Sequence, residues 1–281
     1  MKITNDRILV IVIFLLATAL SVAQVGVGTF TPEGMLDLQN SNSTGFIFPK
    51  VALEGTNIAA PVTNPNGGGL SEGTVVFNTS TTTTGLNDVT PGIYAWDGTQ
   101  WIPQYLREDA VLFEQSPLDF RTVTGDTSYN TGSSDWADVP GLGVGVNTFT
   151  PKYTGIYKIK TSFNFGAGKI VLPGVGDIMM ATTEGLIRLT FDGTPYLIYT
   201  HSYSLYNGTI GGPGGTYYDE FKHDSSKILY VNLTAGQAYN FSLEIDIFVA
   251  THAENGGNSG DGRGHVGIGV PCTVEFTFQD V

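Results

Sequence analysis

The stretch GIYKIKTSFNF, residues 155–165, decides the fold class of this chain. Apolar side chains occupy alternate positions in it, with two lysines and an asparagine between them. The apolar set is Tyr157, Ile159, Phe163 and Phe165. Because successive side chains of a β-strand point to opposite faces, this alternation predicts a strand with one face in a hydrophobic core.

The same alternation returns in four more segments of the C-terminal part. They are residues 186–191, 228–233, 239–247 and 272–278. Asp192-Gly193 follows the first of them and predicts a turn. Short strands of this kind, separated by turn residues, are typical of a sandwich or a jelly roll. We therefore predict an all-β protein in which residues 106–281 form a jelly-roll β-sandwich head domain.

The amino-acid composition excludes two classes of binding partner. The chain of 281 residues carries 13 Lys+Arg against 26 Asp+Glu, a formal net charge of −13. A protein that binds nucleic acid needs a basic surface, and so does one that docks on an anionic membrane, so both classes are excluded. Hydrophobic residues make up 41% and charged residues only 14%, which does not fit a disordered chain.

Residues 1–23 have the three parts of a secretory signal peptide. A short charged start is followed by an apolar run over residues 8–20 and by the small-residue site Ser21-Val22-Ala23. The alternative is a membrane anchor, but the run is shorter than the about 20 residues that span a bilayer. We expect cleavage before Gln24, a secreted or outer-surface location, and no direct insertion into the membrane afterwards.

Residues 24–105 predict a small, loop-rich β module that precedes the head. It is rich in Gly, Thr, Asn and Pro, and residues 60–69 and 78–85 have the composition of linkers. Near its end, Asp97-Gly98 separates two aromatic-rich runs and predicts a two-residue hairpin turn. Such a turn would set Trp96 opposite Thr99 and Tyr94 opposite Trp101.

The rings of that hairpin are weak candidates for ligand binding. Tyr94, Trp96 and Trp101 on one face could stack on sugar rings. The alternative is that they pack the hairpin onto its own module, because an isolated hairpin is barely stable in water.

Four motifs follow one another in this module. QVGVGTFTP (24–32) precedes MLDL (35–38), GFIFPKVAL (45–53) and the aromatic hairpin at 92–102. This order resembles the leader of surface and tail-fibre-like proteins of Bacteroidetes bacteria. The resemblance implies an outer-surface location and a fibre-like, often trimeric, N-terminal stalk or plug.

Four segments of the C-terminal part follow a recognisable order: FTPKYTGIY (149–157), LTFDGT (189–194), LTAGQAY (233–239) and VEFTF (274–278). They resemble the jelly-roll heads of the tumour necrosis factor and complement-head family. The resemblance implies a homotrimer with a binding role, in which the last strand lies near the threefold axis. Phe276 and Phe278 are then the candidate residues of the trimer interface.

Few residues suggest chemistry. Histidines 201, 223, 252 and 265 are scattered and lack the paired spacing of a zinc site. Cys272, the single cysteine, lies on the apolar side of its strand and is expected to be buried and inert. We expect no cofactor and no enzymatic activity.

One loop offers a weak candidate site for calcium. In residues 253–267, Glu254, Asn255, Asn258 and Asp261 supply hard oxygen donors. Their spacing is not that of an EF-hand, and the alternative is a solvated loop.

The leading interpretation is a non-catalytic binding or adhesion protein, trimeric and exposed on the cell surface or secreted. Its head would recognise a glycan or a surface protein. One alternative is a structural subunit or plug of a larger outer-surface assembly. A carbohydrate-active enzyme is the third, but it needs two carboxylates about 5–10 Å apart, and the sequence indicates no such pair.

Overall fold

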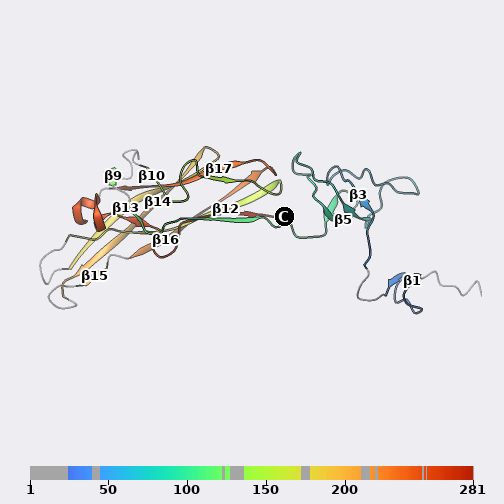
Figure 1. Cartoon of the computed structure of the whole chain (residues 1–281), viewed down its shortest axis with the longest axis horizontal. Helices are drawn as coiled ribbons and strands as arrows, with labels where there is room; N and C mark the ends of the chain where they lie inside the picture. Colours follow the sequence, from blue (N-terminus) through green and yellow to red (C-terminus); the bar gives the residue numbers. More distant parts are fainter. Residues whose placement is uncertain are drawn as a thin grey trace, which may run out of the picture. The chain divides into compact units, whose positions relative to one another are not determined.

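The computed structural model describes residues 25–39, 45–121, 124–126, 136–171, 178–209, 216–218, 221–248, 250 and 252–280. The chain forms two compact units, Met1–Phe48 and Pro49–Val281, which are described separately (Figure 1). The predicted signal peptide lies outside the described residues. Within the described part, no helix has the length and apolar character to cross a membrane.

The first unit contains a single small parallel sheet. Strand β1 (Val25–Val27) pairs with β2 (Leu36–Leu38), and Val25 lies opposite Leu36. Parallel sheets in folded proteins are normally covered on both faces. These two strands are covered on neither face within the described chain, because their apolar side chains are exposed.

The second unit begins with a four-stranded sheet in the order β3-β4-β5-β6. The strands are β3 (Lys50–Val51), β4 (Val75–Asn78), β5 (Gly92–Trp96) and β6 (Trp101–Pro103). Its core consists of Leu53, Val76, Val89, Tyr94, Trp96 and Trp101. Buried Asn78 holds the loops around it, because its side chain accepts from Leu53 N and donates to the carbonyls of Ser80 and Thr90.

The β5–β6 hairpin corrects the predicted turn. Trp96 pairs with Trp101 and Tyr94 with Pro103, so the turn has four residues instead of two. The Asp97 side chain explains the difference. Its Oδ1 atom accepts hydrogen bonds from the backbone N–H groups of Thr99 and Gln100, both at 2.7 Å, which stabilises the longer turn.

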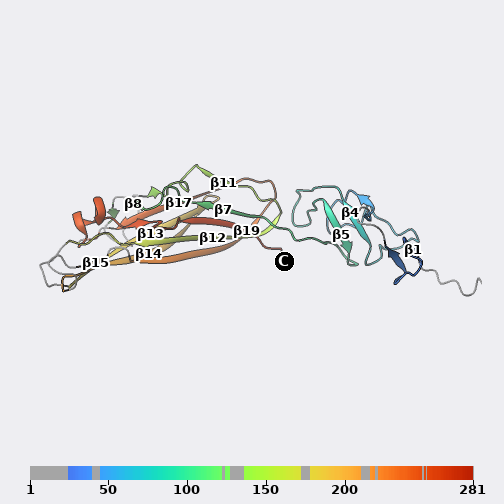
Figure 2. The ribbon, with the colours of Figure 1, turned by 60° about the horizontal axis from the view of Figure 1, so that its bottom comes forward.

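The rest of the second unit is a sandwich of two sheets (Figure 2). One sheet has the order β7-β19-β12, with β18 and β16 also paired to β12 and β8 paired to β18. Its strands are β7 (Ala110–Glu114), β8 (Phe120–Arg121), β12 (Gly155–Gly166), β16 (Lys222–Leu233), β18 (His265–Val266) and β19 (Thr273–Phe278).

The opposite sheet has the order β10-β17-β13-β14-β15, with β9 and β11 also paired to β17. Its strands are β9 (Thr124–Asp126), β10 (Ala137–Asp138), β11 (Asn147–Phe149), β13 (Ile178–Phe191), β14 (Thr194–Asn207), β15 (Thr216–Tyr218) and β17 (Tyr239–Phe248). Two short 3-10 turns, η1 (Glu254–Gly257) and η2 (Gly260–Gly262), precede β18.

The core of the sandwich follows the alternation in the sequence. All four apolar residues of the 155–165 stretch are buried, and so are the alternate residues of β17. Asp192 and Gly193, with φ of 46° and 77°, form the predicted two-residue turn between β13 and β14. Cys272 lies in the same core, where burial raises the pKa of its thiol to about 12. The prediction of an all-β protein with a β-sandwich is confirmed.

Candidate binding surfaces

The three candidate rings of the hairpin lie inside the small core. Tyr94, Trp96 and Trp101 are all buried, and the two tryptophan rings contact each other edge to face at 5.3 Å. Trp101 Nε1 also donates to the carbonyl of Ile58 at 2.9 Å. Rings placed in this way have no free face for a sugar, so their role is to pack the module.

The candidate trimer residues also face inward. Strand β19 lies between β7 and β12, and its even-numbered side chains point into the sandwich. Phe276 stacks on Phe149 with ring centroids 4.2 Å apart, and Phe278 packs against Tyr157. The alternation that predicted an apolar face was right, but the core of the same chain covers that face. Phe276 and Phe278 are therefore core residues and offer no surface to a second copy.

The candidate calcium loop already uses part of its oxygen set. Glu254 forms an ion pair with Lys169 at 3.0 Å, and the Asp261 carbonyl accepts from the backbone N–H of Lys169 at 2.7 Å. Asn255 donates through Nδ2 to the Ser259 carbonyl. Within the described residues, no three acidic, histidine or cysteine side chains are grouped as metal ligands. Calcium binding by this loop remains a prediction.

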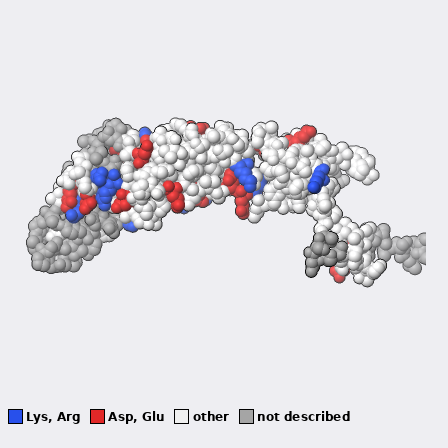
Figure 3. All heavy atoms as spheres, viewed as in Figure 1, with Lys and Arg blue, Asp and Glu red and all other residues white. Residues whose placement is uncertain are grey.

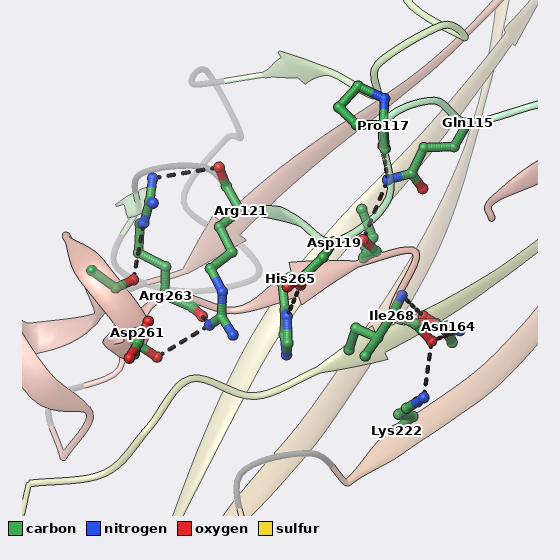
Figure 4. Close-up of polar contacts among 12 residues, drawn as sticks. Gln115, Pro117, Asp119, Arg121, Asn164, Lys222, Asp261, Arg263, His265 and Ile268 are labelled. Carbon is green, nitrogen blue, oxygen red and sulfur yellow. Dashed lines mark hydrogen bonds and ion pairs between the residues drawn. The ribbon is translucent and has the colours of Figure 1, made fainter. Parts of the chain in front are cut away.

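A polar network holds the segment that leads into β19 (Figure 4). Buried His265 is paired through Nδ1 with the carboxylate of Asp119. Nearby, Arg121 donates from Nη1 to the carbonyls of Asp261 and Arg263. These contacts tie strands β8 and β18 together and position the loop that follows.

A shallow groove of about 430 Å³ lies beside that loop, on the outer face of the β12–β16 pair. It is lined by Lys160, Ser162, Phe163, Asn164, Asp224, Ser225, Ser226, Val270 and Pro271. Asn164 forms one wall, because its side chain exchanges two hydrogen bonds with the backbone of Ile268. Lys222 donates to the same carbonyl at 2.9 Å, which fixes the start of β16 (Figure 4).

A cluster of five rings lies where β14 of one sheet contacts β16 of the other. We call it the ring cluster: Tyr199, His201 and Tyr203 from β14, with Phe221 just before β16 and His223 within it. Ring centroids are 4.8 Å apart for Tyr203–Phe221 and 5.0 Å for His201–His223. The sequence analysis missed this cluster because its two histidines lie on different strands. Aromatic residues at alternate positions 199, 201 and 203 were the available signal.

Nearly all apolar side chains described in the first unit are exposed. Its exposed apolar side chains are Val25, Val27, Phe30, Met35, Leu36, Leu38, Phe46 and Ile47. Val25 is 54% exposed and its cross-strand neighbour Leu36 is 57% exposed. Exposed apolar side chains that gather on one surface are typical of interaction sites, so this set is a candidate interaction surface.

Part of the chain, including most of this surface, matches a known protein family. Residues 26–117 match the model of a family described as the phage tail like trimerisation region. The match covers about a third of the 281 residues and includes β1 except Val25, the whole of β2 and the whole four-stranded sheet. A search of curated proteins finds no match for the chain. The matched family is named for assembly and not for catalysis.

Proposed function

We propose that this chain is a trimeric, non-catalytic binding or adhesion protein of the tail-fibre-like type. Its N-terminal region brings three copies together, and its sandwich head carries the surface that recognises a glycan or a protein. Secretion through the signal peptide at residues 1–23 would place it outside the cell or on the outer surface.

The exposed apolar set of the first unit is the observation that carries this proposal. A two-stranded sheet is at best marginally stable alone. Covering β1 and β2 with the same strands of two other copies would bury their apolar side chains, and each half-exposed Val or Leu would then contribute about 1 kcal/mol. The family match over residues 26–117 supports further copies of this chain as the covering partner.

The head supports a binding role through its surface. Charged side chains are sparse over much of the surface that Figure 3 shows. The head also carries the ring cluster and the β12–β16 groove. The order β7-β19-β12-β16, in which sequence neighbours are kept apart, supports a jelly-roll connection between the two sheets.

The proposal is tested by the mass of the full chain in solution. Sedimentation equilibrium at micromolar concentration should give three times the mass of one chain. A single-chain mass over the same concentration range would reject it. Intact mass of protein secreted by its own cells should begin at Gln24, and a product that retains residues 1–23 would reject the proposed location.

The family match also favours a second candidate, a structural subunit of a larger outer-surface assembly. In this case the protein would be recovered from its cells as part of a large complex. The two functions differ in a measurable way, since a free trimer with its own ligand supports the first and recovery only within a complex supports the second.

A further inference from the structure

The ring cluster has the geometry of a stacking platform. Tyr199, His201 and Tyr203 alternate along β14 and so point to the same face of the sheet, at intervals of about 7 Å. Tyr199 is 42% exposed, and Phe221, which stacks against Tyr203, is 36% exposed. Aromatic surface therefore remains open to solvent along the strand.

The neighbouring strand places polar groups beside these rings. In the β13–β14 register, Glu184 lies opposite His201 and Thr182 lies opposite Tyr203. Directly paired residues share one face of a sheet, so the Glu184 carboxylate and the Thr182 hydroxyl flank the line of rings. Neither side chain makes a hydrogen bond or ion pair with another described residue, which leaves their hydrogen-bonding capacity for a ligand or water.

Two hydrogen bonds hold the segments that carry the rings in position. Ser202 points to the opposite face of β14, and its Oγ donates to the Phe221 carbonyl at 2.6 Å. Lys222 is tied to the Ile268 carbonyl at 2.9 Å. Both segments that carry the rings are thus anchored, and a preorganised surface loses less entropy when it binds.

Rings beside a carboxylate and a hydroxyl fit a saccharide. A pyranose has C–H groups that pack on the face of an aromatic ring and a rim of hydroxyl groups that donate to carboxylate and accept from imidazole. The five rings carry no fixed charge, and the chain is strongly acidic, so an acidic sugar would be repelled. The chemistry favours a neutral oligosaccharide.

We propose that the ring cluster, together with Glu184 and Thr182, is a binding site for a neutral oligosaccharide. This inference deepens the proposed function and depends on it only for its role at the cell surface. A protein partner is less well matched, because stable protein interfaces bury about 800 Å² on each side and surround their anchors with a broad contact area.

The experiment uses the full chain on a printed array of neutral hexose and N-acetylhexosamine oligosaccharides, followed by calorimetry with the strongest binder. Tyr199→Ala and Glu184→Gln should each weaken binding about tenfold or more, which corresponds to about 1.4 kcal/mol. Both positions face outward, so the melting temperature should stay near that of wild type and show that the variants fold.

Tyr230→Ala is the matched control. Tyr230 is an exposed tyrosine on β16, 65% exposed and outside the ring cluster, so its removal should leave binding unchanged. No binding by the wild type, binding only to acidic glycans, or equal loss in Tyr230→Ala would overturn the site. The association state is measured on the same samples. If the chain is a trimer but binds no saccharide, the saccharide site is rejected and the trimer stands. If it is a monomer that binds saccharide through Tyr199, the trimer is rejected and the site stands.

Discussion

The Thr154 hydroxyl donates a hydrogen bond to Asp88 Oδ2 at 2.7 Å and joins the small four-stranded module to the sandwich. Thr154 Oγ1 also accepts a hydrogen bond from the backbone N–H of Ala235 at 3.0 Å. Asp88 Oδ1 in turn accepts from Thr82 Oγ1 and from the backbone of Thr84. One carboxylate and one hydroxyl thus connect three segments within the second unit.

This junction makes the stability of the chain sensitive to acid. Burial raises the pKa of Asp88, but hydrogen bonds from Thr154, Thr84 and Thr82 outweigh it, so the pKa lies below the ordinary 3.8. A carboxyl with a depressed pKa stabilises the fold above its unfolded-state pKa, and this contribution is lost as the pH falls through the folded-state pKa. Asp88→Asn should therefore melt below wild type at pH 7, with the difference narrowing towards pH 2.

Melting curves across this range check the prediction, with Asp224→Asn as control. Asp224 is exposed and accepts no hydrogen bond from another described residue, so its replacement should give a small difference at every pH. A difference between Asp88→Asn and wild type that is constant from pH 7 to pH 2 would show that the carboxylate charge does not stabilise the junction.

Phe276→Ala should lower the free energy of unfolding by about 3–5 kcal/mol, because it removes a buried ring that stacks on Phe149. The folded fraction should keep the association state of wild type. Denaturant titration and sedimentation measure the two effects separately. Thr273→Ala, on the outward side of the same strand, is the control and should change stability by less than about 0.5 kcal/mol. If Phe276→Ala lost association but kept the wild-type free energy of unfolding, Phe276 would belong to the trimer interface.

A chelator should leave the melting temperature of the purified chain unchanged. The Glu254 carboxylate is already neutralised by Lys169, so the loop has lost one of its charged donors for calcium. Asp261→Ala should melt alike with and without the chelator. A fall in the wild-type melting temperature that Asp261→Ala abolishes would establish a cation site in this loop.

Local patterns predicted the strands of the sandwich well because each of β12, β17 and β19 buries at least one face. The period of two in β12, β17 and β19 identified the core residues, and Asp192-Gly193 identified a tight turn. The same pattern carries no information on what covers a buried face, which is why Phe276 was assigned to a partner. The β5–β6 register was missed because the Asp97 side chain, and not backbone preference alone, selects the turn length.

Neither the ring cluster nor the exposed apolar surface of the first unit could be predicted from the sequence alone. His201 and His223 meet only because β14 of one sheet and β16 of the other come into contact. In the sequence, Val25 and Leu36 belong to the motifs QVGVGTFTP and MLDL, which carry no information on what covers these side chains. Their exposure becomes evident only when the structure shows that no other described element covers them.

In the proposed trimer, the apolar surface of the first unit holds three copies together. This role is tested most directly by the molar mass from light scattering of the double variant Val25→Asp/Leu36→Asp beside Leu197→Asp. Leu197 is 54% exposed on the head, much like Val25 and Leu36, and so controls for the added charge. We predict three chain masses for wild type and for Leu197→Asp and one chain mass for the double variant. A wild type of one chain mass, or a double variant that remains at three, would contradict the account.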